Sequence, residues 1–204
     1  MSRTGGERTK KKILAVAEKL FSARGYDGAG VQDIATAAGV NKALIYYHFK
    51  NKQDIIDSLF ARTLDDMFAM VGSPDEQADQ SLHGEGIEER VAGIIGFLEK
   101  KKKILAVMLM EALKNDTNGH VSLFKCAEMV ISRNVEEMMR LLQEKRNTRV
   151  SREELLMHEF FTGFLPIVFF ALFKNKWAAY FHCRRDTMMD MFIRVFKESH
   201  IRHT

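Results

Sequence analysis

The chain has 204 residues, of which 46% are hydrophobic and 28% charged, and its net charge is +4. This composition fits one or two compact soluble domains with a real core. Its two cysteines lie far apart and outside any Cys-x-x-Cys pair, which excludes a disulfide framework and a zinc ribbon and favours a reducing cytoplasm.

The positive charge is concentrated near the N-terminus. Residues 1–54 hold ten Lys/Arg and five Asp/Glu, giving +5, whereas residues 55–204 hold 21 and 22, giving −1. This asymmetry is expected of a domain that binds phosphates, although a plain basic tail would also produce it. The first twelve residues, MSRTGGERTKKK, lack an apolar run, so no signal peptide is expected.

The first predicted helix runs from about Thr9 to Ala23 and ends at Gly25. Residues 1–8 are polar and contain glycine, which predicts a flexible arm before it. The lysines that open the helix, residues 10–12, are either a solvated helix start or phosphate contacts. The apolar stripe of the helix consists of Ile13, Leu14, Ala17, Leu20 and Phe21.

Residues 31–49, VQDIATAAGVNKALIYYHF, predict two short helices joined by a tight turn. The first has Ile34 and Ala35 on one apolar face. Gly39 can adopt the left-handed conformation that ends a helix, and Asn41 is a good N-cap for the next one. The second helix is expected to bury Ile45 and, one turn later, Phe49.

The opposite face of this second helix is unusual. At about 100° per residue, Ala43 and Tyr47 point directly away from Ile45, with Leu44 and Tyr46 beside them. Solvated helix faces are usually charged, so a face of aromatic and small residues indicates contact with another molecule. A helix-turn-helix that inserts its second helix into the DNA major groove is the natural candidate.

The run GYDGAGVQDIATAAGVNKALIYYHFKNKQDI, with KKKILAVAEKLFSARG before it, resembles the N-terminal DNA-binding domain of TetR-type transcriptional regulators. The resemblance covers about residues 9–60. Where the family commonly has Thr or Ser, this chain has Ala29 and Gly30. Gly30 is expected to cap the helix and to leave free N–H groups for a phosphate. The matching positions are Ile13, Ala17, Phe21, Gly25, Tyr26, Ile34, Ala35, Gly39, Val40, Tyr46, Phe49, Lys50 and Lys52.

Two roles are predicted on this domain. Residues on the exposed helix face would contact base edges, because apolar groups can contact the thymine methyl. Cationic and polar residues around them would contact phosphates, and the resemblance places Lys52 at such a contact. The base-edge candidates are Ala43, Leu44 and Tyr47, and the phosphate candidates are Lys42, Tyr46, His48 and Lys52.

The chain as a whole predicts an all-α protein with about nine helices. The resemblance implies that it is divided into a helix-turn-helix domain at 1–50 and a helical ligand-binding and dimerisation domain at 51–204. Capping boxes are predicted at Asn51–Asp54 and Ser151–Glu154. Lys100 to Lys103 favour a solvated helix junction over a nucleic-acid patch. Further helices are expected at 52–71, 87–99, 104–114, 120–145, 151–181 and 186–198, and the helix at 151–181 is expected to bend near Pro166. The connections between them are expected at 72–86, 115–119, 146–150 and 182–185.

The helix at 151–181 is apolar on more than one side. Its nearly apolar run, Phe160–Phe173, is too short to span a bilayer and predicts a buried helix. A helix that is apolar all round needs cover on every side, and a second copy of the chain is the simplest source. The resemblance likewise implies a homodimer formed by the helices near 151–181 and 186–198.

The resemblance also implies a cavity for a small apolar or amphipathic effector. Methionine and aromatic residues at helical spacing are candidate lining, although such stripes more often form plain core. Charged residues among them are candidate anchors, although each is more often a surface residue or already paired. The effector candidates are Met108, Glu111, Phe124, Glu128, His158 and Phe161; His120 and His182 have no metal-ligand spacing, and no metal or cofactor is expected.

The sequence therefore predicts a cytoplasmic, dimeric repressor that an effector releases from a palindromic double-stranded operator. The alternatives are an activator of the same fold and a helical scaffold that binds protein and has no DNA site. An enzyme is not expected, because the chain has no Gly-x-Ser-x-Gly, phosphate-binding glycine loop or His-Glu-x-x-His motif.

Overall fold

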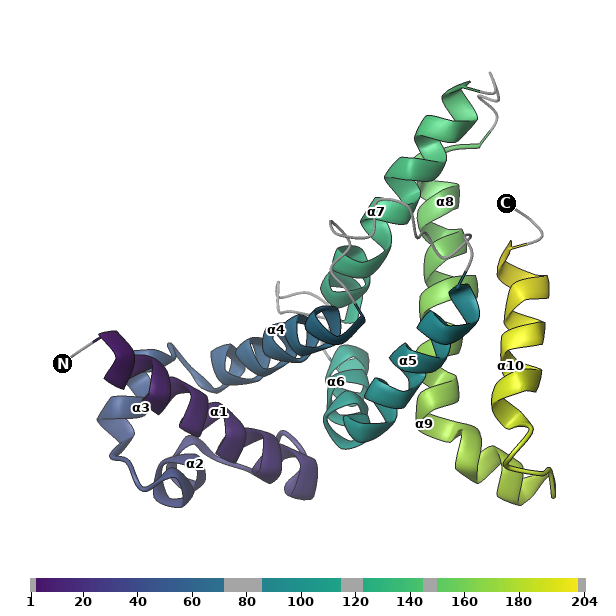
Figure 1. Ribbon diagram of the computed structural model, residues 1–204. Coiled ribbons are helices and arrows are strands. Elements are labelled where there is room, and N and C mark those ends of the chain that lie inside the picture. Colours follow the sequence, from purple (N-terminus) through teal and green to yellow (C-terminus); the bar gives the residue numbers. More distant parts are fainter. Residues whose placement is uncertain (1–2, 72–85, 115–122, 145–149, 202–204) are drawn as a thin grey trace. The chain divides into compact units, whose positions relative to one another are not determined.

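The computed structural model describes residues 3–71, 86–114, 123–144 and 150–201, and within them the secondary structure is entirely helical (Figure 1). The described residues form nine continuous helices, as the sequence predicts. They are α1 (Arg3–Arg24), α2 (Val31–Ala38), α3 (Lys42–His48), α4 (Lys52–Val71), α5 (Ile87–Lys100), α6 (Lys102–Lys114), α7 (Leu123–Glu144), the continuous helix α8 (Arg152–His158), η1 (Glu159–Phe164) and α9 (Leu165–Tyr180), and finally α10 (Met188–Phe196) with η2 (Lys197–Ile201).

The first helix is longer than predicted. It begins at Arg3 instead of near Thr9, so the expectation of a flexible arm is wrong for residues 3–8. The Thr9 hydroxyl donates to the Gly5 carbonyl at 3.0 Å, which supports this first turn despite its two glycines. The predicted connections at 72–86, 115–119 and 146–150 lie almost wholly outside the described residues.

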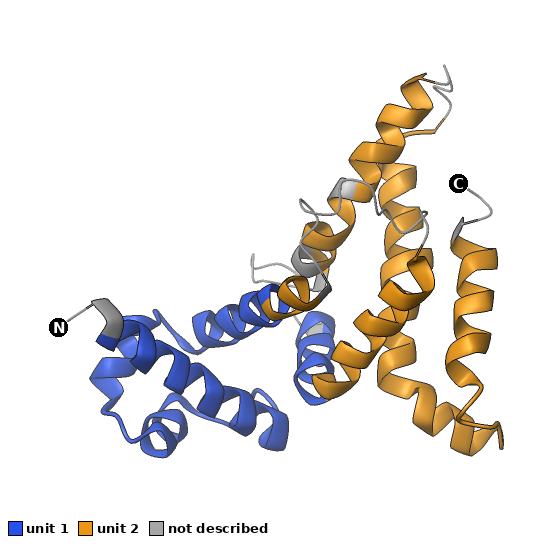
Figure 2. Ribbon diagram, in the orientation of Figure 1, with its two compact units in different colours: residues 1–65, 103–123 blue, residues 66–102, 124–204 orange. Residues whose placement is uncertain are grey.

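The helices form two compact units (Figure 2). The first comprises residues 1–65 and 103–123, and the second comprises residues 66–102 and 124–204. The functional division that the sequence predicts, between 1–50 and 51–204, stays a prediction.

In the first unit, α1 packs against α2 and α2 against α3. Four of the five residues in the predicted apolar stripe of α1 are buried in this core, and Leu20 is half-buried. The buried side chains include Ile13, Leu14, Ala17 and Phe21 from α1, Ile34, Ala35 and Ala38 from α2, Ile45 and Phe49 from the α3 region, and Ile55, Ile56 and Leu59 from α4.

In the second unit, α9 packs along α5, and α10 contacts both helices. The Lys174 ammonium donates to Glu99 Oε2 at 2.8 Å and ties α9 to α5 at the edge of this contact. Lys197 makes a similar bond to Glu88 at 2.7 Å, between η2 and the start of α5. The apolar core includes Val91, Ile95, Ile167, Val168, Ala171 and Phe196.

The long helix changes its winding just before Pro166. Residues 159–164 are in the π conformation, and the Leu165 N–H donates to the Phe160 carbonyl five residues back. Pro166, which has no N–H, follows directly after this π turn and removes one backbone donor from the continuous helix. The bend that the sequence predicts near Pro166 stays a prediction, and the change that the structure does show there is a π turn on the N-terminal side of the proline.

A buried polar cluster joins this π turn to the C-terminal helix. Glu159 and His200 are both fully buried, and Glu159 Oε1 lies 3.6 Å from His200 Nε2. Asn134 donates to the other Glu159 oxygen at 3.0 Å, and the Thr162 hydroxyl lies 2.8 Å from His200 Nδ1. Because His158 Nε2 faces the His200 carbonyl at 3.2 Å, that nitrogen carries a hydrogen. The cluster fixes η2 against η1.

The continuous helix Arg152–Tyr180 has 29 residues and contains a window of mean hydropathy 1.8, so by length and composition alone it could cross a membrane. The predicted apolar run, Phe160–Phe173, is only the middle of this helix. Within the single chain 33% of that window is buried, so the expected cover of its other sides by a second copy of the chain stays a prediction. Core helices of soluble proteins pass the same test, so this is weak evidence for a membrane span.

Replacing Gly163 by Ala should destabilise the second unit. A methyl group there would lie 2.9 Å from His200 Cε1, and that ring is fully buried. We expect the free energy of unfolding to fall by about 1–3 kcal/mol, measured by chemical denaturation. The matched control is Gly96→Ala in α5, where nothing lies within 4 Å and helix propensity favours alanine. Equal effects of the two changes would contradict the packing of His200 on Gly163.

Candidate nucleic-acid interface

The turn between α2 and α3 has the geometry that its sequence predicts. Gly39 adopts φ 62° and ψ 39°, the left-handed conformation, and the Val40 N–H donates to the Ala35 carbonyl at 3.0 Å. Asn41 then caps α3, because its Oδ1 accepts the Leu44 N–H at 2.7 Å. These local bonds set the direction in which α3 leaves the turn.

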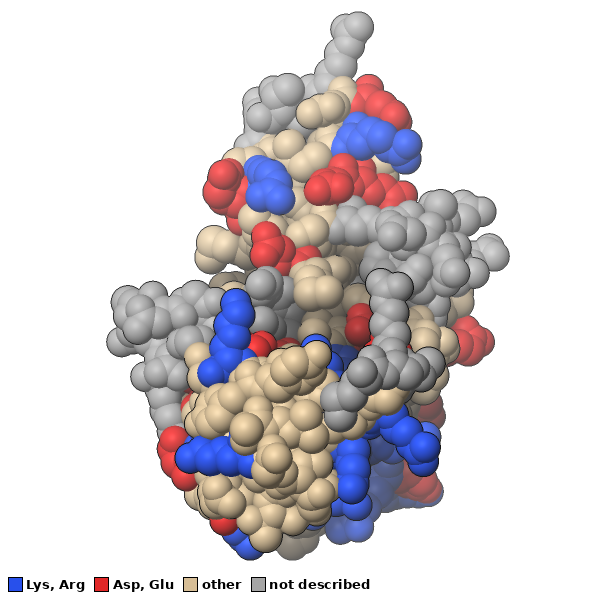
Figure 3. Space-filling model, turned by 90° about the vertical axis from the view of Figure 1, so that its left-hand side faces the viewer, with Lys and Arg blue, Asp and Glu red and all other residues tan. Residues whose placement is uncertain are grey.

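The face of α3 opposite its buried residues is open to solvent. Ile45 is 1% exposed, whereas Tyr47 is 76% and Tyr46 49% exposed, and Ala43 is exposed as well. Lys42 is exposed at the start of the helix, with its Nζ 5.9 Å from the centre of the Tyr46 ring. Figure 3 views the side on which α1–α3 lie and shows a broad uncharged surface with Lys and Arg side chains on both sides of it.

Two lysines of α1 reach this helix-turn-helix. Lys10 Nζ lies 5.4 Å from the centre of the Phe49 ring. Lys12 Nζ lies 3.8 Å from the position that a Cβ on Gly39 would occupy, which places its charge beside the turn. From the sequence alone, the lysines at 10–12 could either face solvent or contact phosphate, because only the packing of α1 determines where their side chains point. Lys10 and Lys12 lie beside the helix-turn-helix, and their contact with phosphate stays a prediction.

The start of α2 differs from its prediction. The Gly30 N–H donates to Asp33 Oδ2 at 2.8 Å, so the expectation that this N–H is free for a phosphate is wrong. The Asp33 carboxylate also places a negative charge at this helix end, with Arg24 Nη1 4.0 Å away. A carboxylate at this position repels a DNA phosphate.

The start of α4 carries another of the predicted phosphate contacts, Lys52. Lys52 is half-buried, and its Nζ lies 4.1 Å from the centre of the Tyr26 ring. Asn51 caps α4 by accepting the Asp54 N–H at 2.8 Å, while Asp54 accepts the Lys50 N–H at 2.8 Å. At Asn51 the predicted cap bond is present, but the reciprocal bond of Asp54 goes to Lys50 instead of Asn51. At Ser151 the predicted capping box is complete, with Ser151 Oγ accepting the Glu154 N–H at 3.2 Å and Glu154 Oε2 accepting the Ser151 N–H at 2.7 Å.

Tyr26 is held between α1 and α4. Its ring lies 5.5 Å from that of Phe21, and its hydroxyl donates to Gln53 Oε1 at 2.9 Å. Burial raises the pKa of the Tyr26 phenol to about 12, and the negative charges of Glu111, Asp57 and Asp27 add to this shift.

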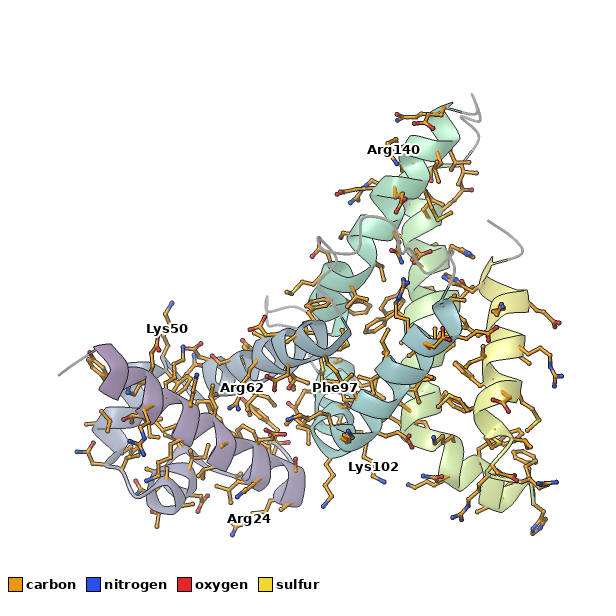
Figure 4. The ribbon with its side chains drawn as sticks, viewed as in Figure 1. Arg24, Lys50, Arg62, Phe97, Lys102 and Arg140 are labelled. Atoms are coloured by element: carbon orange, nitrogen blue, oxygen red, sulfur yellow. The ribbon has the colours of Figure 1, made fainter. Side chains whose placement is uncertain are left out.

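Two other predicted DNA contacts are only partly accessible. His48 is half-buried, with its ring edge-on to Tyr47 at 5.0 Å and tilted against Phe49 at 6.3 Å. Leu44 is half-buried on the flank of α3. Figure 4 shows two further cations of this unit, Arg24 at the end of α1 and Lys50 between α3 and α4, both pointing outward. The exposed Lys50 extends the basic border of α3.

The effector candidates are divided between the two units. In the first, Met108 is buried and Glu111 half-buried. In the second, Phe124 and Phe161 are 63% and 58% exposed and Glu128 is exposed, while His158 bonds to the C-terminal segment. Within the described residues, no group of three His, Cys, Asp or Glu side chains could hold a metal ion.

Residues 13–59 match the family model described as bacterial regulatory proteins, tetR family. Curated relatives align over segments of similar length. The transcriptional repressor KstR2 of Rhodococcus jostii is 40% identical over 63 residues, which are 31% of this chain and 30% of that protein. The regulator AcrR of Shigella flexneri is 41% identical over 54 residues, or 26% of this chain and 25% of AcrR. The chain thus aligns with less than a third of the length of these relatives.

Solved structures extend the fold similarity to nearly the whole chain. The fatty acid degradation regulator FadR of Bacillus halodurans superposes with a TM-score of 0.63 at 19% identity and covers 93% of each chain. A TetR-family transcriptional regulator of Haemophilus influenzae gives 0.61 at 15% identity and covers 96% of this chain and 98% of that one. At such identities the comparison supports the fold and nothing further.

The Tyr26 phenol should ionise near pH 12 in the folded protein, against 10 for a free tyrosine. Because the folded pKa is raised, the neutral phenol stabilises the fold fully below pH 10, and this contribution is lost as the pH rises from 10 to 12. The measurement is a pH titration of phenolate absorbance for the wild type and for Tyr26→Phe. The difference between the two curves should rise near pH 12. A difference centred near pH 10 would contradict the burial of this hydroxyl.

Proposed function

We propose that this chain, which carries the DNA-binding domain of the TetR-type regulators at its N-terminus, is a cytoplasmic transcriptional repressor with no catalytic role. One observation carries the proposal. The α3 helix is anchored by Ile45, presents an exposed uncharged face at Ala43, Tyr46 and Tyr47, and is bordered by lysines. A face of this kind fits the major groove, where apolar groups contact base edges and flanking cations contact phosphates.

The two kinds of contact have separate tasks. Ala43, Leu44 and Tyr47 select the sequence, and Tyr47 is 76% exposed. Phosphate contacts fix the position of α3 and supply most of the affinity, through Lys42, Tyr46, His48 and Lys52. Lys10 and Lys12 of α1 join this second set, since their ammonium groups lie beside the helix-turn-helix.

The repressor acts as a homodimer joined by α8–α9 and α10. The support is an aromatic stripe on α9, exposed at successive turns of the helix. Phe169 and Phe173 stack at 5.7 Å, and one turn further on Trp177 contacts Phe181 at 4.8 Å, so aromatic side chains recur along this side of the helix. A dimer with two recognition helices about 34–36 Å apart reads the two halves of a palindrome.

A small apolar or amphipathic effector controls DNA binding. It favours one of two separations of the recognition helices, only one of which fits the operator. Phe124 and Phe161 are the strongest of the candidate contacts, because they are large, apolar and exposed in the second unit. Met108, Glu111, Glu128 and His158 remain further candidates.

A protein-binding scaffold is the alternative that the exposed α3 face also permits. The two functions differ in salt dependence. Neutralising several phosphates releases counterions, so binding to DNA weakens steeply with added salt, whereas a largely apolar protein contact does not.

Selection of bound fragments from a random pool of duplex DNA tests the proposal. The wild type should recover a palindromic motif, and binding to it should weaken as salt is added. Tyr47→Ala should recover an altered motif, with a loss of about 1–3 kcal/mol at the affected base pair only. Failure to recover any motif at low salt would reject DNA recognition, and uniform weakening at all sites would reject base reading by Tyr47.

Replacing Phe173 by Glu should weaken the dimer. Phe173 is 43% exposed in the single chain and lies at the middle of the aromatic stripe, so a charge there would be buried in the interface. Sedimentation velocity should show the wild type as a dimer and the variant as mainly monomer at the same concentration. Asn175→Glu, at another exposed position on α9, is the matched control and should stay dimeric. A monomeric wild type would exclude the interface.

A further inference from the structure

Lys52 occupies an electrostatically unfavourable position. It is the first residue of α4, and the partial positive charge of a helix N-terminus disfavours a cation there. Its side chain is nevertheless half-buried instead of extending into solvent. The compensating contact is the face of Tyr26, 4.1 Å from Nζ to the ring centre. An aromatic face attracts a cation through its quadrupole.

The Tyr26 ring is itself fixed from two sides. Gly25, at φ 74°, turns the chain at the end of α1, and its N–H donates to the Phe21 carbonyl at 2.9 Å. The ring then lies against Phe21, and its hydroxyl bonds to Gln53. Gln53 in turn donates to Asp57 Oδ1 at 2.9 Å, one turn further along α4. The ring is therefore tied to both α1 and α4.

We propose that Tyr26 is a positioning residue for DNA binding, whose ring holds the Lys52 ammonium at the start of α4 for a backbone phosphate. This rests on the proposed function, and it adds a residue that does not itself touch DNA. A lysine held in one place loses less conformational freedom on binding than a free one. The other lysines near α3 are held less closely, since Lys10 and Lys42 lie 5.4 and 5.9 Å from their nearest ring centres.

The electrostatic surroundings agree with this role. Burial, together with the negative charges of Glu111, Asp57 and Asp27, raises the pKa of the Tyr26 phenol above its ordinary value of 10.0, which already exceeds physiological pH. The phenol is therefore neutral there and keeps its hydrogen bond to Gln53. A DNA phosphate that approaches the Lys52 ammonium therefore does not have to displace a phenolate from it.

A double-mutant cycle tests the proposal. Using a DNA fragment from the selection, Tyr26→Leu should weaken binding about three-fold, the size of an exposed cation–π contact. Lys52→Ala should lower the slope of log affinity against log salt by about 0.9. In the Lys52→Ala background, Tyr26→Leu should have no further effect. Tyr26→Phe, which keeps the ring and loses the hydroxyl, should bind within a factor of two of the wild type.

Lys50 provides the matched control, because it is an exposed lysine two residues away. In a Lys50→Ala background, Tyr26→Leu should keep its full three-fold effect. An equal effect of Tyr26→Leu in all three backgrounds would overturn the positioning role while DNA binding itself stands. A wild type that binds no duplex would instead remove the proposed function.

A spectroscopic measurement on the free wild-type protein does not depend on the variants folding. The ring current of Tyr26 should move the Lys52 Hε resonances upfield from those of Lys50. This shift should persist in Tyr26→Phe and vanish in Tyr26→Leu, with thermal unfolding recorded for each variant. Lys52 Hε resonances at unperturbed positions in the wild type would overturn the proposal.

Discussion

The DNA-binding surface depends on the burial of two side chains behind it. The α3 helix has seven residues, which is too short to be stable alone. Ile45 and Phe49, each 1% exposed, anchor it in the core that α1 and α2 provide. Once they are buried, the period of the helix leaves Ala43 and Tyr47 pointing outward. The interior of the first unit therefore determines which residues can meet a base pair.

The parts of the fold that local chemistry determines could be predicted from the sequence. The left-handed Gly39, the Asn41 cap and the Ser151 cap each depend on residues within a few positions along the chain. Helical periodicity likewise identified the buried stripe of α1. The early start of that helix was missed, because two glycines and a polar composition do not reveal the bonds that support its first turn.

Contacts between segments that lie far apart in the chain could not be predicted from the sequence. Nothing in the local pattern shows that Lys52 faces Tyr26, since these residues lie on different elements of the chain. The direction of Lys12 toward Gly39 likewise depends on how α1 crosses the turn. The bond from the Gly30 N–H to Asp33, in contrast, could have been predicted from the sequence. The spacing of Asp33, three residues after Gly30, is that of a capping pair, a signal that could have shown the amide to be occupied.

The cluster around Glu159 and His200 has a consequence for the order in which the protein acquires its structure during synthesis. The core of α1–α3 comes from about fifty consecutive residues, so it can close while the ribosome is still translating the remainder. The cluster joins Asn134, Thr162 and His200, so it cannot form before residue 200 has left the ribosome. The nascent chain thus acquires its helix-turn-helix well before the segment that would pair two copies.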